Sequence, residues 1–334
     1  MFNSVKEFHT ELNNLTIPNR NFHELALKRQ SILSKPMGSL GRLEELACFM
    51  ATWQETERPK SDKAQVLVFA GNHGACDQGI NPFPQEITLQ MVENFNKGGA
   101  AINQLALQNG AELNVILLAE GKQTSDFTKG PAMSEEECLD ALNVGANSVD
   151  LNSDILLLGE MGIGNSTISA ALCLASFGGQ SKDWVGAGTG SDLKGIELKR
   201  KVVDLAHSVN AAKLGSSFEI LCAMGGREQA AICGALVAAR KHRIPVLVDG
   251  FIACSAVAPL SPYKGIFDHM LVAHKSAEFG HTLLLKYIDK DPILDLDMRL
   301  GEGTGSVLAL AVIKSALACH NGMATFEEAG LTGR

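Results

Sequence analysis

Two glycine-rich segments have the composition of phosphate-binding loops. The first, at residues 159–167, reads Gly-Glu-Met-Gly-Ile-Gly-Asn-Ser-Thr and leads into an Ala-rich segment with helical spacing. Glycines let backbone N–H groups converge, and a helix N-terminus adds positive potential, so such a loop can hold a phosphate. The spacing nearly fits the P-loop of NTPases, but Asn165 stands where that motif has lysine, which argues against an NTPase.

The second segment, at residues 186–192, reads Gly-Ala-Gly-Thr-Gly-Ser-Asp. Neither segment completes the G-x-G-x-x-G pattern of dinucleotide-binding proteins. Each segment alone is equally compatible with a tight turn that uses glycine for its positive φ. Because we expect both to follow strands, we favour a phosphate or nucleotide ligand.

Two carboxylates stand on glycine-rich backbone. Glu302 lies in Arg-Leu-Gly-Glu-Gly, residues 299–303, and Glu160 lies in the first glycine loop. A carboxylate before a helix can simply stabilise the positive end of the helix dipole. We favour a role in chemistry, since acid–base catalysis at an anomeric carbon needs carboxylates near a cationic transition state.

Histidines and aspartates offer a competing interpretation as metal ligands. The candidates are His73, His274 and His281, with Asp77 and Asp249. No His-x-x-x-His or similar ligand spacing supports a metal site. We therefore rank metal binding below hydrogen bonding or substrate contact, and Asp249 equally fits a cap of the helix that follows it.

Short apolar runs and longer helical segments alternate from residue 65 onward. Continuous apolar strands alternating with helices predict an α/β fold, a parallel sheet with helices on both faces. Ligands bind at the carboxyl ends of the strands in such folds, so we expect the loops above to meet there. Residues 1–60 and 307–319 are predicted to be helical and to form a small second domain. The six runs are residues 66–69, 115–118, 155–158, 220–223, 246–248 and 270–272.

Composition excludes several classes of protein. The 29 Lys+Arg against 37 Asp+Glu give a net charge of −8 with no basic stripe, which argues against nucleic-acid binding. No apolar run approaches the roughly 20 residues of a membrane span, and the N-terminus lacks an apolar signal core. The eight cysteines form no Cys-x-x-Cys pair and mostly lie in apolar stretches, which indicates buried thiols in a reducing compartment. We expect a soluble, cytoplasmic protein.

Taken together, the motifs resemble those of the nicotinate-nucleotide:dimethylbenzimidazole phosphoribosyltransferase family, which makes the lower-ligand nucleotide of cobalamin. The resemblance covers nearly the full chain. The segments at residues 35–44 and 299–303 are the most specific, and the order of the motifs makes chance agreement improbable. The other matching segments are residues 72–74, 130–133, 159–162, 165–167, 225–226, 247–251 and 274–278.

The resemblance implies transfer of phosphoribose from nicotinate mononucleotide to a benzimidazole, with inversion at C1′ and release of nicotinate. It implies that Glu302 is the general base and that Glu160 and Lys199 belong to the catalytic set. Without the resemblance, Lys199 would be read as an ordinary exposed helix lysine. The expected phosphate and ribose contacts are Gly159, Met161, Gly162, Ile163, Gly164, Asn165, Ser166, Thr167, Gly188 and Ser276.

The azole pocket is expected to involve Phe83, Met91 and Leu300, which offer apolar cover for a bicyclic ring. An apolar pocket discriminates weakly, by about 1–3 kcal/mol for a methyl-sized change. Some relatives carry Ser and Gln at the positions of Phe83 and Met91, so the preferred azole stays open. Smaller departures, Asn72 for Asp, Ser166 for Thr and Phe279 for Pro, leave the predicted base in place.

The resemblance also implies an architecture. A large Rossmann-like α/β catalytic domain of residues 63–306 joins a small helical domain of residues 1–62 with 307–334. A homodimer is implied, in which the partner's small domain closes over each active site. No metal or redox cofactor is implied.

Two alternatives belong to other classes. One is a metal-dependent hydrolase of nucleotide phosphates that uses His73, Asp77 and His274, which predicts sensitivity to chelators. The other is a non-catalytic nucleotide- or azole-binding module, which predicts ligand binding without turnover.

Overall fold

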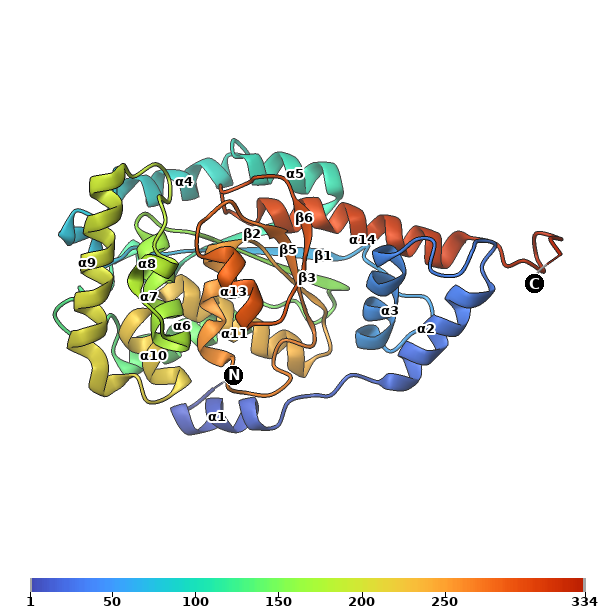
Figure 1. The fold of residues 1–334 in the computed structure, drawn as a ribbon, viewed down its shortest axis with the longest axis horizontal. Helices are drawn as coiled ribbons and strands as arrows, with labels where there is room; N and C mark the ends of the chain where they lie inside the picture. The colour runs from blue at the N-terminus through green and yellow to red at the C-terminus, as the bar shows by residue number, and fades with distance from the viewer. Residues whose placement is uncertain (1, 333–334) are drawn as a thin grey trace.

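A six-stranded, all-parallel β-sheet forms the centre of the computed structural model, which describes residues 2–332 (Figure 1). The strands lie across the sheet in the order β2-β1-β3-β4-β5-β6. Since β2 lies on one side of β1 and β3 on the other, the strand order reverses beside β1, which is where open α/β sheets bind ligands. The strands are Ala64–Ala70 (β1), Ala111–Leu117 (β2), Ile155–Met161 (β3), Val246–Val248 (β4), Met270–Lys275 (β5) and Pro292–Asp295 (β6).

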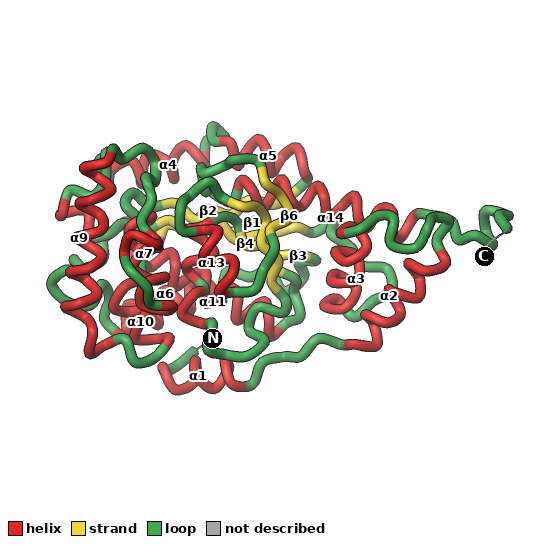
Figure 2. The backbone as a smooth tube through the Cα atoms, viewed as in Figure 1, coloured by secondary structure: helices red, strands yellow, loops and turns green. Residues whose placement is uncertain are grey.

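Helices cover both faces of this sheet, as Figure 2 shows for the strands at the centre. The α-helices are Val5–Asn13 (α1), Arg20–Ile32 (α2), Arg42–Gln54 (α3), Glu86–Asn96 (α4), Ala101–Asn109 (α5), Glu135–Asn147 (α6), Asn165–Phe177 (α7), Ser181–Trp184 (α8), Leu193–Asn210 (α9), Ser217–Met224 (α10), Arg227–Lys241 (α11), Phe251–Ala256 (α12), His281–Tyr287 (α13) and Thr304–Gly322 (α14). Short 3-10 turns occupy Gly74–Gln78 (η1), Leu118–Gly121 (η2), Ala211–Lys213 (η3) and Ala258–Leu260 (η4).

Alternate strand residues point into two separate cores. In β1, Val66 and Val68 pack with α5 and α14, while Leu67 and Phe69 pack with the layer that contains α6, α7 and α11. Successive side chains of a strand face opposite sides of the sheet, so a strand buried on both faces must be apolar throughout. This confirms the α/β class predicted from the apolar runs.

One of the six predicted strands is wrong. Residues 220–223 lie in α10, which begins where Ser216 Oγ accepts a hydrogen bond from the backbone N–H of Glu219. A short run of apolar residues can belong either to a strand or to a helix that is buried on all sides. Here the only sequence signal for a helix is the serine that caps its N-terminus. The sixth strand is instead β6, a half-exposed edge strand that begins with Pro292 and gave no apolar run.

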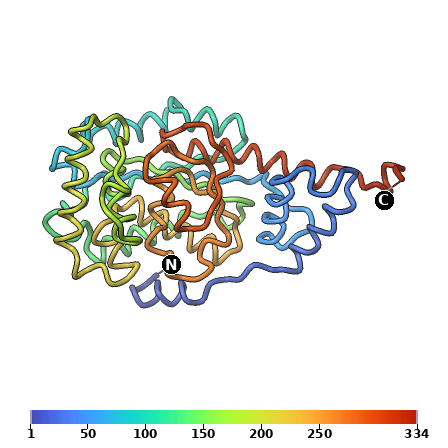
Figure 3. The backbone as a smooth tube through the Cα atoms, in the orientation of Figure 1, coloured from blue at the N-terminus to red at the C-terminus, as the bar shows by residue number. Residues whose placement is uncertain are grey.

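Helices from the two ends of the sequence pack together at one end of the molecule. Helices α2 and α3 lie beside the second half of α14 in Figures 1 and 3, and Arg29 Nε donates to the carbonyl of His320 at 2.6 Å. Helix α1 instead places Phe8 and Leu12 in the main core. The division into residues 63–306 and a helical unit of residues 1–62 with 307–334 stays a prediction.

All eight cysteines are free thiols, and all except Cys319 are buried, as their apolar surroundings in the sequence predicted. Between residues 2 and 332, no helix combines the length and apolarity that crossing a bilayer requires.

Candidate active site

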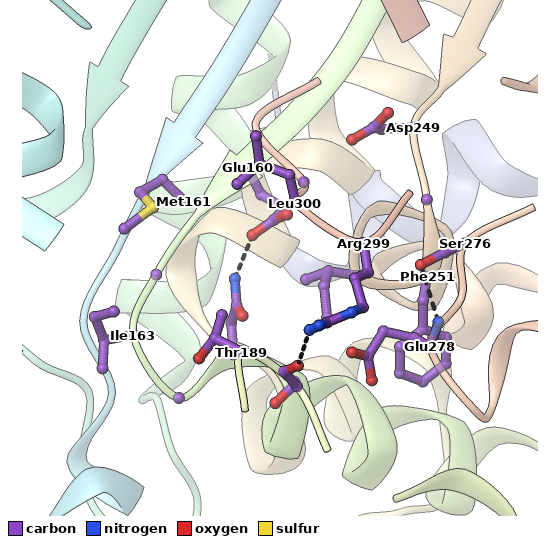
Figure 4. Close-up of a pocket in the computed structure, with 18 of the residues that line it drawn as sticks. Glu160, Met161, Ile163, Thr189, Asp249, Phe251, Ser276, Glu278, Arg299 and Leu300 are labelled. Carbon is purple, nitrogen blue, oxygen red and sulfur yellow. Dashed lines mark hydrogen bonds between the residues drawn. The ribbon is translucent and has the colours of Figure 1, made fainter. Parts of the chain in front are cut away.

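A cavity opens at the carboxyl edge of the sheet, where β3, β4 and β5 end (Figure 4). Its walls come from the first glycine loop, the second glycine loop and the segment that precedes α14. Of the predicted site residues, those that line it are Glu160, Met161, Gly162, Ile163, Gly164, Asn165, Ser166, Gly188, Ser276 and Leu300. Lining residues that were not singled out as contacts include Thr189, Phe251, Glu278 and Arg299. Most of the expected phosphate loop therefore lies in one place.

The first glycine loop forms the turn between β3 and α7. Asn165 donates its backbone N–H to the carbonyl of Gly162, and Ile163 donates its own to Thr88 Oγ1 of α4 at 3.2 Å. The turn therefore presents the N-terminus of α7, a helix of 13 residues, to the cavity. An anion bound there would lie at the positive end of the helix dipole. Thr167 is fully buried and does not line the cavity.

The second glycine loop does not follow a strand, contrary to prediction. It follows α8, a helix of four residues, and leads into α9. It reaches the cavity because Arg299 donates to the carbonyl of Gly188 at 3.1 Å, which ties the loop to the segment before α14. Figure 4 shows this bond across the mouth of the cavity.

Lys199 of α9 lies behind the two glycine loops and not in the cavity wall. Its Nζ donates to Ala187 O at 3.2 Å and to Ser166 Oγ at 3.4 Å. Only 3% of this residue is exposed, so it is not the ordinary surface lysine that its helical setting indicated. Burial lowers the pKa of Lys199, while the negative charge of Glu278 opposes that shift. The lysine therefore places a cation directly beneath the loops expected to hold phosphate.

Ser276 and Glu278 form the wall after β5. The backbone N–H of Glu278 donates to Ser276 Oγ at 3.2 Å, and the N–H of Ser276 donates to His281 Nδ1 at 2.8 Å. The bond that His281 Nδ1 accepts fixes the tautomer of the ring, with the proton on Nε2. Burial is the main cause that lowers the pKa of His281 to about 3, so this ring is neutral at physiological pH.

Glu160 is the penultimate residue of β3 and is held by Asn165, whose side-chain amide donates to its carboxylate. Burial raises the pKa of Glu160 well above its ordinary value, and the charges of Asp249, Glu228 and Glu302 add to that shift. These surroundings favour the protonated form of the carboxyl group.

Glu302 lies directly beside Glu160. Its backbone N–H donates to the carbonyl of Glu160 at 3.2 Å, and its side-chain Oε2 has no hydrogen-bond partner among the described residues. Burial, with a smaller contribution from the charge of Asp249, raises the pKa of Glu302 to about 7. Leu300 and Gly301, the two residues before Glu302, line the cavity, while Glu302 itself is not part of the lining. A buried carboxylate with an unpaired oxygen and a pKa near neutrality is suited to accept a proton.

Close packing of glycine backbone makes this arrangement possible. A Cβ at Gly159 would collide with the backbone of Gly303, and a Cβ at Gly301 would lie 2.5 Å from Glu160 Oε1. Any side chain at these positions would push the two carboxylates apart.

Asp249 caps a helix, but not the one that follows it in the chain. Its carboxylate accepts the backbone N–H groups of Gly303 and Ser306, at the start of α14, while α12 begins at Phe251 after Gly250, which provides no side-chain cap. Sequence spacing could not reveal this, because Asp249 and Ser306 are 57 residues apart.

The three residues expected to contact the azole are less closely grouped. Leu300 lines the cavity and is 56% exposed, while Met91 of α4 is half-buried and Phe83, before α4, is 44% exposed. Neither Phe83 nor Met91 is part of the cavity wall. Helix α4 does reach the site through Thr88, so their role as azole contacts stays a prediction.

The residues of the metal-dependent alternative are not brought together. His73 is fully buried and faces Glu228 at 3.0 Å, His274 faces Asp249 at 3.5 Å, and Asp77 is exposed. Among residues 2–332, no group of three or more His, Cys, Asp or Glu side chains is arranged to hold a metal ion.

Comparison with known proteins places the chain in a family. A family model described as phosphoribosyltransferase matches residues 15–331. A nicotinate-nucleotide–dimethylbenzimidazole phosphoribosyltransferase of Rhodobacter capsulatus is 53% identical over 99% of this chain and 98% of that protein. One of Brucella anthropi is 46% identical over 98% of this chain and 97% of that protein.

Comparison with solved structures agrees with the sequence comparison. The crystal structure of the enzyme of that name from Thermus thermophilus superposes with a TM-score of 0.87 and 33% identity, over 95% of this chain and 100% of that one. The chain therefore belongs to the nicotinate-nucleotide–dimethylbenzimidazole phosphoribosyltransferase family of enzymes.

Proposed function

We propose that this enzyme transfers the phosphoribosyl group of nicotinate mononucleotide to dimethylbenzimidazole or a related azole. The products are an α-ribazole 5′-phosphate and nicotinate, with inversion at C1′, and the reaction serves assembly of the nucleotide loop of cobalamin in the cytoplasm. The observation that carries the proposal is the position of Glu302, a buried carboxyl group with an unpaired oxygen, directly after Leu300 and Gly301, which line the same cavity as the phosphate-type glycine loop.

The proposed chemistry assigns the proton and the bonds as follows. The azole nitrogen that has a lone pair forms a bond to C1′ from the face opposite nicotinate. The bond between C1′ and the nicotinate nitrogen breaks, and its electron pair leaves with nicotinate. Glu302 takes the proton from the other azole nitrogen, which neutralises the ring as it bonds to the sugar. A carboxylate whose pKa lies near neutrality matches this task, because it is ionised at the start and basic enough to hold the proton.

The remaining residues bind the substrates and orient them. The glycine loop at residues 159–167, Gly188 and Ser276 hold the phosphate and ribose, while Lys199 supplies positive charge from behind the loops. Proximity of the two substrates then supplies much of the rate, since it converts a bimolecular step into an intramolecular one. Glu160 supports Glu302 through its backbone carbonyl, which accepts the N–H of Glu302.

The azole is proposed to lie against Phe83, Met91 and Leu300. In the homodimer that we propose, the partner's helical unit closes the outer side of the site. Such closure would cover the exposed side chain of Leu300 and exclude water from the reacting centre.

A product assay tests the proposal. The purified enzyme is mixed with nicotinate mononucleotide and dimethylbenzimidazole in EDTA, and mass spectrometry measures α-ribazole phosphate and nicotinate. We expect both products in equal amounts, and we expect Glu302→Gln to lower turnover by about 10²–10⁴, as for loss of a general base. A folded enzyme that forms neither product with dimethylbenzimidazole, benzimidazole, a phenol or adenine would contradict the proposal, and so would activity lost in EDTA alone.

A further inference from the structure

Asp249 connects the end of β4 to the turn that contains Glu302. Its Oδ2 accepts the backbone N–H of Gly303 at 3.1 Å, and its Oδ1 accepts that of Ser306 at 3.0 Å. The first donor follows Glu302 directly in the chain. The carboxylate of Asp249 is therefore bonded on the far side of the turn from Glu160, whose carbonyl accepts the N–H of Glu302 at 3.2 Å.

The backbone of Glu302 needs this support. Glu302 has a φ of +61°, in the left-handed region that residues with a Cβ adopt at a cost of about 1 kcal/mol or more. Such a conformation persists where the surrounding contacts over-determine it. The three backbone hydrogen bonds, one from Glu302 itself and two from residues just after it, provide that constraint.

Asp249 is itself held in one position. The ring of His274, buried within β5, packs against it with Nε2 3.5 Å from Oδ1. Gly305 admits that ring, because a Cβ there would collide with it. Asp249 is 1% exposed, so its carboxylate is shielded from water and retains a strong effect on nearby charges.

We propose that Asp249 is a positioning residue for the reaction: it fixes the turn that aims the carboxylate of Glu302, and its negative charge keeps that carboxylate basic. The inference rests on the proposed role of Glu302 as the base. Asp249 touches no reacting atom in this role and acts only through Glu302.

The charges around Glu302 support the second half of the proposal. Asp249 contributes to the raised pKa of Glu302, after burial. The other titratable groups close to the pair are Glu160 from β3, whose own pKa is raised, His274 from β5 and the thiol of Cys254 from α12, whose pKa the charge of Asp249 helps to raise. Burial raises the pKa of Asp249 itself, while His274 and the backbone N–H donors oppose that shift and favour its charged form. Glu228 from α11 acts on Glu160. Removing the charge of Asp249 should thus lower the pKa of Glu302 and weaken it as a base.

Asp249→Asn removes the charge and leaves one acceptor oxygen for two N–H donors. We expect the acid limb of the kcat/KM profile to move down by about one pH unit and kcat to fall at least tenfold. Asp249→Glu keeps the charge but moves the carboxylate by one methylene, so kcat should fall while the acid limb stays in place. Asp140→Asn, the same change on the exposed face of α6, is the matched control and should leave both quantities unchanged.

A double-mutant cycle separates positioning from general structural support. If Asp249 acts through Glu302, then Asp249→Asn should cost nothing further in an enzyme that already carries Glu302→Gln. Additive losses, or an acid limb that does not move in Asp249→Asn, would overturn the inference. Full activity in Glu302→Gln alone would instead overturn the proposed base, a distinguishable result.

A direct titration covers the case in which Asp249→Asn does not fold. The carboxyl of Glu302 can be titrated by ¹³C NMR in the wild-type enzyme, with Glu302→Gln to assign its signal. A midpoint near the ordinary glutamate value of about 4.3 would overturn the inference. A raised midpoint that persists in Asp249→Glu would support it.

Discussion

The backbone N–H of Glu302 donates to the carbonyl oxygen of Glu160 at 3.2 Å, which places two buried carboxyl groups on adjacent backbone segments, the end of β3 and the turn before α14. Burial raises the pKa of both carboxyl groups, that of Glu302 to about 7 and that of Glu160 well above its ordinary value, and the charge of Glu302 adds to the shift at Glu160. In the mechanism that we propose, Glu302 is the base and Glu160 supports the backbone of Glu302.

The pH dependence of the reaction should report Glu302. The base must be ionised to accept a proton, and a pKa of about 7 means that Glu302 is half ionised near pH 7 and almost fully ionised only a pH unit or more above it. We expect kcat/KM to level off above about pH 8 and to fall about tenfold per pH unit below about pH 6. The measurement is a profile from pH 5 to 9 with a fixed, subsaturating azole, corrected for the titration of the azole itself. A profile that is flat down to pH 5 would assign proton transfer to another group.

Glu160→Gln should be much milder than Glu302→Gln. Glutamine reproduces the shape of a protonated glutamate side chain. The backbone carbonyl of residue 160, which accepts the N–H of Glu302, is unchanged by the substitution. We expect less than a tenfold loss in kcat and an acid limb that shifts slightly downward, since one potential negative charge is gone. Steady-state kinetics at pH 8 measure the loss in kcat of both variants. Equal losses in the two variants would mean that Glu160 shares the role of base.

The sequence predicted the parts of this site that depend on local pattern. Apolar runs gave five of the six strands, and glycine with a following helix gave the loop at residues 159–167. Both signals arise from neighbours in the chain, because strand burial and helix caps are local requirements.

The parts that could not be predicted depend on contacts between distant segments. Asp249 bonds to the start of α14, Lys199 of α9 bonds to Ser166 at the start of α7, and Arg299 bonds to Gly188. A lysine in α9 has the same local pattern whether it faces water or a loop. Residues 220–223 were assigned to a strand for a related reason, since burial among other helices leaves no polar face to show the helical period.

Lys199→Met should weaken binding of nicotinate mononucleotide. The variant keeps the length of the side chain but removes the charge beneath Ser166 and Ala187. We expect the KM for nicotinate mononucleotide to rise at least tenfold while the KM for the azole changes little. Lys194→Met, on an exposed turn of the same helix, is the matched control. A change confined to the azole KM would place the phosphate elsewhere.

Leu300→Ala should affect the azole side of the site. Leu300 lines the cavity next to Glu302, and truncating it removes apolar contact with a bicyclic ring. The expected cost is about 1–3 kcal/mol in kcat/KM for dimethylbenzimidazole, with a smaller loss for unsubstituted benzimidazole, which has no methyl groups to contact the leucine. Leu193→Ala, at an exposed position on α9, should change neither value. Equal losses for the two azoles would show that Leu300 shapes the turn and not the pocket, and would shift the recognition of the methyl groups to Phe83 and Met91.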